Sequence, residues 1–429
     1  MISKGFPKVI SFSEEMKKLW SNIISLGILQ ISNYILPLLT FPYLVRVLGA
    51  EYFGLLAFVG ATTMYLSLIT DYGFNLSATR AISINRDNQF KVNEIFSAVM
   101  IIKLGFLVMS LVMLSLLVFS FEKFNQHWEL YFISFGIVVG QTIFPVWLFQ
   151  GLEKMKYITY INLSAKAFFT ACIFIFVHDI EDYWIVPTLN SLGFFVAGLF
   201  SLYIASTRLC ISYKHPKVSA LREQLYDGYH VFASTISISF YTISGAFILG
   251  LFAGNIVVGY YAVAEKTIQA VKGLYAPVSQ AIYPSLSQKI HTDRGAGLVF
   301  AKNMILIIGC AMLLVSLALF FLAELIVQLL VGVSSGEIII LLKIMSFVPF
   351  LVSLSNIFGI QIMLNLGFQR VFSQILVVAA VLGLALNFAL VPTHGAIGTA
   401  IATVGVELFV TIAMATYLIL KLPHLFRSR

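Results

Sequence analysis

Apolar stretches long enough to cross a lipid bilayer recur along the whole of this chain. A membrane-spanning helix needs about 20 residues, most of them apolar. Such stretches occupy residues 19–43, 55–75, 95–121, 130–150, 157–177, 184–205, 228–252, 258–283, 298–322, 337–364, 371–391 and 396–420. The sequence therefore predicts an all-α, polytopic membrane protein with twelve transmembrane helices.

The composition supports the same class and excludes a water-soluble protein. Hydrophobic residues make up 59% of the 429 residues and charged residues only 11%, whereas soluble proteins carry about 25% charged residues. Twelve helices would use about 240 residues, which leaves short connections and excludes a large domain outside the membrane. Cys172, Cys210 and Cys310 show no paired spacing, so we expect neither a disulfide framework nor a metal site, and no cofactor.

Basic residues mark one side of the membrane. Nineteen of the 27 lysines and arginines lie in the two tails and in every second loop, whereas the other loops hold only Arg46 and Lys123. Cytoplasmic loops carry such an excess. We therefore expect both termini in the cytoplasm, and we interpret the net charge of +8 as topology rather than as a sign of a nucleic-acid partner.

The twelve stretches divide into two halves of six, which predicts two lobes. The expected parts are a cytoplasmic tail at 1–18, an N-terminal lobe at 19–205, a cytoplasmic linker at 206–227, a C-terminal lobe at 228–420 and a second cytoplasmic tail at 421–429.

The two halves also echo each other in sequence. At one constant offset, Gly49, Gly54 and Ala57 match Gly254, Gly259 and Ala262, and a second echo joins Gly151-x-x-Lys154 to Gly367-x-x-Arg370. Both echoes fall at equivalent places in the two halves. Because each half has an even number of helices, the repeats are parallel, and we expect a ligand pathway between the lobes.

Charged residues inside the expected helices indicate a polar interior. The basic ones are Lys103, Lys166, Lys266, Lys272 and Lys343. A lysine at the bilayer centre costs about 2.5–3.5 kcal/mol, so these side chains must face a wet or paired interior unless they reach the surface or pair locally. Lys103 and Lys166 lie about 12–14 Å deep and are the strongest candidates for a cavity. We expect this interior to be cationic, as the passage of an anion such as pyrophosphate requires.

Acidic residues inside the helices are fewer. Asp71 and Glu407 could each neutralise a lysine; alternatively, a desolvated carboxyl could load and release a proton and so couple transport to an ion gradient.

Prolines within the expected helices predict bends. They are Pro37, Pro42, Pro145, Pro277 and Pro349. Proline removes a backbone hydrogen bond and kinks a helix, which suits a carrier with two states, although membrane helices tolerate proline in general.

Four segments along the chain carry motifs in a characteristic order. They are Pro42–Gly49 with Glu51–Gly54, Asp71–Arg80, Phe144–Met155 and Gly259–Lys266. In sequence and spacing they resemble the polysaccharide repeat-unit flippases of the Wzx (O-antigen) type, within the superfamily of multidrug, oligosaccharidyl-lipid and polysaccharide exporters. The resemblance implies a MATE-like fold, with two six-helix lobes around a central cavity.

The resemblance further implies a multi-pass protein of the bacterial inner membrane that is not an enzyme. Such flippases move an undecaprenyl-pyrophosphate-linked oligosaccharide from the cytoplasmic to the periplasmic leaflet by alternating access, in a pathway with a polysaccharide polymerase and a chain-length regulator. By analogy Asp71, Asn75, Arg80 and Arg46 are the polar motif residues to test first, and helix capping or a structural salt bridge is the alternative for each. Arg46 is also a candidate for contact with the substrate in the cavity, together with the five lysines.

Other functions remain open at this point. A drug or cation antiporter of the same superfamily is the nearest alternative, and the lysines inside the helices argue against it. A membrane glycosyltransferase or polymerase acting on the same lipid is a third candidate. Such enzymes need a catalytic site on a sizeable outer loop, and the expected outer loops are short.

Overall fold

The computed structural model describes residues 9–422, and over this range the chain forms helices and no strand. The N-terminal half contains α1 (Val9–Asp71), α2 (Phe74–Ile84), α3 (Gln89–Ser120), α4 (Glu122–Asn125), α5 (Trp128–Ile143), α6 (Val146–Gly151), α7 (Met155–Phe176), the 3₁₀ helix η1 (Ile180–Trp184) and α8 (Ile185–Arg208). The C-terminal half contains α9 (Val218–Thr242), α10 (Ser244–Phe252), α11 (Asn255–Thr292), α12 (Arg294–Phe321), α13 (Ala323–Val331), α14 (Gly336–Met345), α15 (Val348–Asn356), the π-helix η2 (Ile357–Met363) and α16 (Gln369–Lys421). The predicted all-α fold is confirmed.

Several of these helices are long and apolar enough to cross a membrane. Among the described residues eight such segments are found, which makes the chain an integral, multi-pass membrane protein. Two very long helices reverse direction inside their bounds, because Gly49 in α1 and Gly395 in α16 have non-helical backbone angles. Each of these helices carries two of the expected ranges. The total of twelve transmembrane helices stays a prediction.

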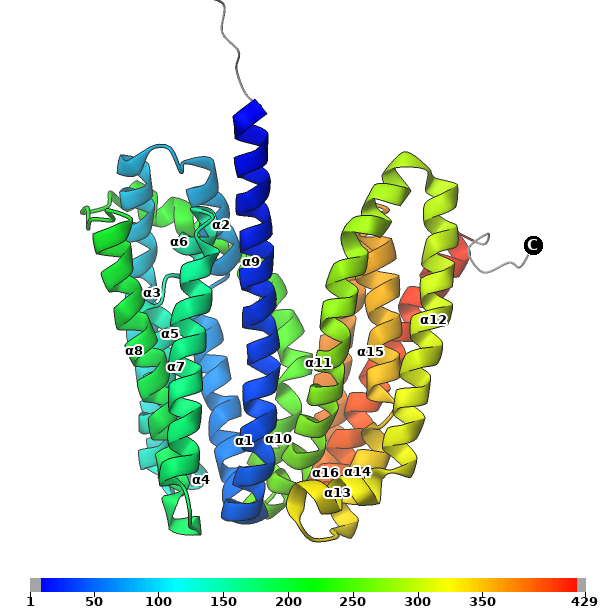
Figure 1. Ribbon diagram of the computed structural model, residues 1–429. Helices are drawn as coiled ribbons and strands as arrows, with labels where there is room; N and C mark the ends of the chain where they lie inside the picture. Colours follow the sequence, from blue (N-terminus) through cyan, green and yellow to red (C-terminus); the bar gives the residue numbers. More distant parts are fainter. Residues whose placement is uncertain (1–8, 423–429) are drawn as a thin grey trace, which may run out of the picture.

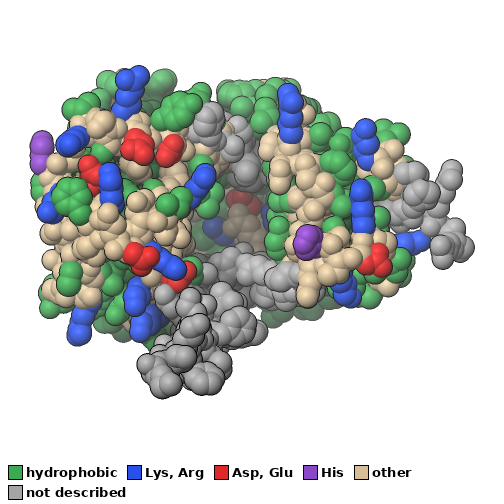
Figure 2. All heavy atoms as spheres, turned by 90° about the horizontal axis from the view of Figure 1, so that it is seen from above, with side chains coloured by type: hydrophobic (Ala, Val, Ile, Leu, Met, Phe, Trp, Pro, Cys, Tyr) green, Lys and Arg blue, Asp and Glu red, His purple; other side chains and the backbone are tan. Residues whose placement is uncertain are grey.

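The helices are arranged as two lobes that meet at one end and diverge at the other (Figure 1). Helices α1 to α8 form the N-terminal lobe, and α10 to α16 form the C-terminal lobe. Helix α9 packs against α2 and α3 of the first lobe and against α16 of the second. It begins at Val218, inside the range expected to be a linker. Seen from the open end, the molecule is hollowed between the lobes (Figure 2).

At the closed end, α1 and α11 cross at a pair of glycines. A side chain on Gly54 would collide with the carbonyl oxygen of Asn255 and the backbone of Gly259, and one on Gly259 would collide with the carbonyl oxygen of Ala50. Gly54 and Gly259 are equivalent in the sequence repeat, and so are Ala50 and Asn255. The contact is therefore reciprocal about the axis that relates the two halves, and small residues permit the close approach of the helices.

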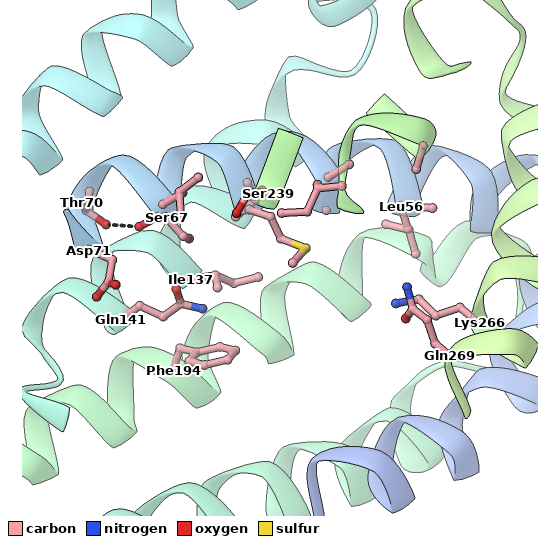
Figure 3. A pocket seen from close by; sticks show the side chains of 18 of the residues that line it. Leu56, Ser67, Thr70, Asp71, Ile137, Gln141, Phe194, Ser239, Lys266 and Gln269 are labelled. Carbon is pink, nitrogen blue, oxygen red and sulfur yellow. Dashed lines mark hydrogen bonds between the residues drawn. The ribbon is translucent and has the colours of Figure 1, made fainter. Parts of the chain in front are cut away.

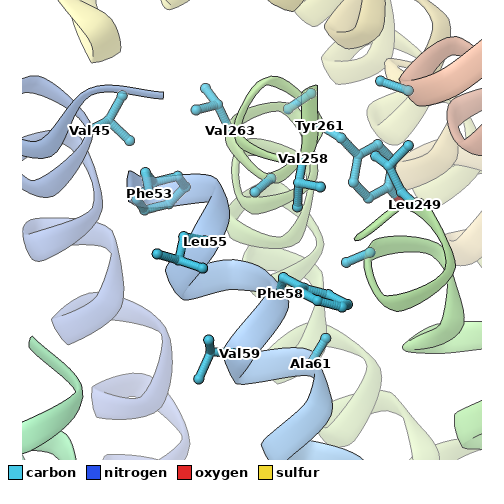
Figure 4. Close-up of a cluster of buried hydrophobic side chains, with 14 of the residues drawn as sticks. Val45, Phe53, Leu55, Phe58, Val59, Ala61, Leu249, Val258, Tyr261 and Val263 are labelled. Carbon is cyan, nitrogen blue, oxygen red and sulfur yellow. The ribbon is translucent and has the colours of Figure 1, made fainter. Parts of the chain in front are cut away.

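Tightly packed side chains fill the space around this crossing (Figure 4). Phe58 of α1 is 1% exposed and lies against Gly250 of α10, next to Val258 and Tyr261 of α11. It also packs on Phe124 of α4, with ring centroids 5.3 Å apart. Within a membrane such van der Waals packing, rather than exclusion of water, holds helices together.

Two of the expected proline bends coincide with breaks between helices. Pro145 lies between α5 and α6, and Pro349 opens α15 after the end of α14, so helices are interrupted at both. By contrast, α1 stays helical through Pro37 and Pro42, and α11 continues through Pro277. The reversal in α1 occurs at Gly49, where φ is +68°, a conformation that glycine adopts without strain.

Candidate functional site

A cavity of about 810 Å³ lies between the lobes. Its N-terminal wall is formed by residues of α1, α2, α3, α5, α6, α7 and α8, and its C-terminal wall by residues of α9, α10 and α11. Most lining side chains are apolar, and a few polar ones converge on the space (Figure 3). This combination is typical of a ligand site, where apolar walls enclose the ligand and a few polar groups orient it.

On the N-terminal wall, Asp71, Asn75 and Lys103 lie together. Helix α1 ends at Asp71, and Gly73, with φ of +78°, allows the turn into α2. Asn75 Nδ2 donates to Asp71 Oδ1 at 2.7 Å. Lys103 of α3 is only 3% exposed, interacts electrostatically with Asp71, and donates to the carbonyl oxygen of Gln141 at 3.5 Å. Three residues singled out in the sequence thus form one cluster in the cavity wall.

On the C-terminal wall, one face of α11 presents Glu265, Lys266 and Gln269 to the cavity. Gln269 Nε2 donates to Glu265 Oε1 at 3.2 Å. The charges continue away from the cavity, because Lys272 interacts electrostatically with both Glu265 and Glu407 of α16. Lys272 and Glu407 are therefore linked to the cavity wall without belonging to its lining.

The charges of the described lining are balanced. They comprise two lysines, Lys103 and Lys266, and two carboxylates, Asp71 and Glu265. This lining therefore does not confirm the expected cationic interior. Glu265 makes the difference, because only Asp71 and Glu407 were expected as acidic residues of the interior, yet Glu265 also lines the cavity.

The other lysines expected in the interior lie elsewhere. Lys166 of α7 lies with its ammonium 5.7 Å from the centroid of the Phe194 ring, and Phe194 itself lines the cavity. Lys343 of α14 is exposed and lies 5.7 Å from the centroid of the Phe320 ring. Neither belongs to the lining.

Arg46 and Arg80 are likewise outside the cavity lining. Arg46 donates to the carbonyl oxygens of Leu329 and Leu330 in α13, and so connects the lobes at the closed end. Lys123, the other basic residue of the expected outer loops, makes a similar connection to the carbonyl oxygen of Ala253. Arg80 is exposed on α2, near the open end.

The two segments most specific for the resemblance pack against each other. Thr79 Oγ1 donates to the carbonyl oxygen of Trp147 at 3.2 Å and approaches Gln150 Oε1 at 3.3 Å. Gly151 packs on Ile82, where a side chain would collide. Much of each motif therefore builds the contact between α2 and α6, and only Asp71 and Asn75 of the first, with Phe144 and Val146 of the second, reach the cavity.

Sequence reasoning missed the uncharged polar residues of the cavity. Gln141 of α5, Asn162 of α7 and Gln269 of α11 line it. They carry no charge, so neither hydropathy nor the distribution of lysines distinguishes them from other helix residues.

Comparison with known proteins identifies the chain. The family model described as polysaccharide biosynthesis protein matches residues 19–290. A protein of Escherichia coli (strain K12) named "Putative O-antigen transporter" is 37% identical over 92% of this chain and 95% of its own length. The chain belongs to the polysaccharide biosynthesis protein family. A second family relative, from Shigella dysenteriae and with the same name, is 30% identical over 93% of this chain and 99% of its own length. The predicted membership in the Wzx-type group is thereby confirmed.

Solved structures show the fold of this family member. The lipid II flippase MurJ in an inward closed conformation matches with a TM-score of 0.70 at 14% identity, over 92% of this chain and 87% of that chain. An inward-facing multidrug resistance MATE family transporter of the MOP superfamily matches with a TM-score of 0.64 at 15% identity, over 91% and 98%. The predicted MATE-like architecture of two lobes around a central cavity is confirmed.

Proposed function

We propose that this protein is a flippase that moves lipid-linked polysaccharide repeat units across the bacterial inner membrane. Its substrate would be an undecaprenyl-pyrophosphate-linked O-antigen unit or a related surface polysaccharide unit, carried from the cytoplasmic to the periplasmic leaflet. Two relatives that are called O-antigen transporters, each aligned over nearly the whole chain, support this assignment.

The cavity between the lobes carries the proposal. It is closed at the end where α1 and α11 cross, and Figure 2 shows the hollow from the opposite end. That open end lies on the side where α1 begins and α16 ends (Figure 1). With both termini in the cytoplasm, as the basic loops predict, the cavity receives substrate from the cytoplasmic leaflet. Transport then requires the lobes to separate at the closed end.

The charged residues of the cavity have different parts in this proposal. Lys266 is exposed in the cavity and suits the pyrophosphate headgroup, whereas Lys103 is buried next to Asp71. Asp71 and Glu407 remain the candidates for ion coupling, because each lies near a lysine with which a proton could be exchanged. The expected partners are the polymerase and the chain-length regulator of the same pathway.

Deletion of the gene tests the function. The deletion strain should lose its surface polysaccharide and accumulate lipid-linked repeat units on the cytoplasmic leaflet, and the cloned gene should restore export. Unchanged surface polysaccharide in a strain with no substitute flippase would contradict the proposal.

A cation or drug antiporter is the second candidate. The carboxylates Asp71 and Glu265 in the cavity wall favour it, since a cationic substrate needs negative charge along its path. If this candidate is right, overexpression of the protein should lower susceptibility to cationic drugs and leave the surface polysaccharide unaffected.

A further inference from the structure

Gln141 and Asn162, on the N-terminal wall of the cavity, differ from two other amide side chains that line it, Asn75 and Gln269. Asn75 and Gln269 each donate to a neighbouring carboxylate. Gln141 and Asn162 also line the cavity and are partly buried, but their side-chain amides make no hydrogen bond within the part of the chain that the structure describes. Their donors and acceptors are thus available to a ligand, whereas those of Asn75 and Gln269 hold the charged clusters together.

The chemistry of these amides matches a hydroxylated, uncharged ligand. An amide offers an N–H donor and a carbonyl acceptor, and a sugar hydroxyl is both donor and acceptor, so the two groups pair without any charge. Phe194 lies beside Gln141 in the same wall (Figure 3), where its ring provides an apolar surface for the C–H face of a sugar. A few polar groups within apolar and aromatic walls are the usual means by which a pocket orients its ligand.

Each wall carries one lysine and one carboxylate, but the exposed lysine lies on the C-terminal wall. Lys266 and Gln269 lie at the far end of the cavity from Asp71, Gln141 and Phe194 in Figure 3. Lys266 is exposed, while Lys103, the lysine on the N-terminal side, is 3% exposed and has Asp71 beside it. An anionic headgroup is therefore favoured at the C-terminal wall, and a neutral group at the N-terminal wall.

The size of the cavity limits how much of a substrate it encloses. Its volume of about 810 Å³ lies within the range of roughly 300–1,000 Å³ that encloses ligands of drug size. A long repeat unit would extend beyond it, so that the sugars nearest the headgroup are the ones in contact with the wall.

From these observations we propose that Gln141 and Asn162 form, with Phe194, a sugar-binding site that selects repeat units by the sugars next to the pyrophosphate. The proposal rests on the proposed flippase function and assigns the headgroup to Lys266 and the sugars to the opposite wall. The two amides are specificity-determining residues in this assignment, and the headgroup binds independently of them.

Binding of two lipids to the purified, full-length protein tests the assignment. One probe is undecaprenyl pyrophosphate without sugars, and the other is the same lipid carrying the native repeat unit. For Gln141→Ala and for Asn162→Ala, the Kd of the sugar-bearing lipid should rise about 2- to 10-fold, the equivalent of one hydrogen bond. The Kd of the sugar-free lipid should stay within about twofold. Asn190→Ala is a matched control, because Asn190 is an exposed amide of the same lobe outside the cavity.

The outcomes separate the sugar site from the function itself. An equal loss of affinity for both lipids, or no loss for either, in variants that unfold at the wild-type temperature would overturn the sugar site. Wild-type protein that binds neither lipid would overturn the flippase function instead. Export assays in strains that make repeat units with different first sugars provide a second measurement: both variants should change the ratio in which the units are exported, and an unchanged ratio would contradict the proposal.

Discussion

The closed and the open ends of the molecule hold the two lobes by different kinds of contact. At the closed end, backbones meet directly at Gly54 and Gly259, and Arg46 and Lys123 donate to carbonyl oxygens of the other lobe. At the open end, contact runs through α9, where Phe232 stacks on Tyr72 with ring centroids 4.8 Å apart. A backbone crossing tolerates no added atom, whereas hydrogen bonds from long side chains can break and form again. The closed end thus combines a tight seal with contacts that permit opening.

Substitution at the glycine crossing should have the largest effect. In Gly259→Leu the new side chain collides with the carbonyl oxygen of Ala50, so α1 and α11 must move apart. Overpacking of this kind costs up to about 3 kcal/mol, and we expect export of surface polysaccharide to fall about 100-fold.

Gly254→Ala is the control for this substitution. Gly254 lies in the turn before α11 with open space around its Cα, so this variant should export normally. Wild-type export by Gly259→Leu would show that the crossing does not seal the closed end.

Loss of the buried lysine should have the next largest effect. Lys103→Ala leaves Asp71 without its cationic neighbour, and an unpaired charge of this kind costs about 2 kcal/mol, or 30-fold in export. The double variant with Asp71→Asn distinguishes two roles. If it restores export, the pair is structural; if export stays low although the protein accumulates normally, the pair takes part in transport.

The cationic bridges at the closed end should have a moderate effect. Arg46→Ala removes two hydrogen bonds between the lobes and Lys123→Ala removes one; at about 1 kcal/mol per bond, the loss of each bond shifts the population toward opening about fivefold. The measurement is labelling of a single cysteine, Ala61→Cys in the cavity wall, by a membrane-impermeant maleimide from the periplasmic side, in a background that lacks the three native cysteines.

Labelling at the wild-type rate in both variants would show that these bridges do not limit opening. Lys343→Ala serves as the matched control, since this exposed lysine lies over Phe320 within its own lobe.

Lys166 should have the smallest effect. Its ammonium lies over the Phe194 ring and not in the cavity lining, so Lys166→Ala loses a cation–π contact of about 0.5 kcal/mol and orients Phe194 less well. We expect about a twofold fall in export in a complementation assay. A fall as large as that of Lys103→Ala would place Lys166 in direct contact with the substrate.

The sequence predicted how deep in the membrane charged residues lie better than it predicted whether their side chains face the cavity. Lys103 and Asp71 were expected in the interior, and they meet in the cavity wall because both lie deep in the same lobe. Lys272 was expected there as well but lies behind the wall, where Glu407 interacts with it. Hydropathy and spacing locate a residue along the membrane normal, and only the packing of neighbouring helices decides which face of its helix borders the cavity.

Two other misses have related causes. Arg46 was grouped with the cavity residues through its motif, but it lies at the closed end because the chain reverses direction just after it at Gly49. Gln141 and Asn162 gave no signal, because an amide in a helix is compatible with a cavity, a helix contact or lipid. The repeat was more informative: it paired Gly54 with Gly259 by position, and the structure shows that these two residues touch.

The glycine crossing also resembles the contact of a symmetric dimer. In a twofold dimer, every contact between two positions occurs twice, once in each direction across the symmetry axis. Here Gly54 meets Asn255, and the equivalent Gly259 meets the equivalent Ala50. A single chain that contains such an isologous contact inherits its constraint. A larger residue at one glycine cannot compensate for a change at the other, because each glycine packs directly against the backbone of the opposite helix. A substitution at either glycine therefore disturbs both contacts of the crossing between α1 and α11.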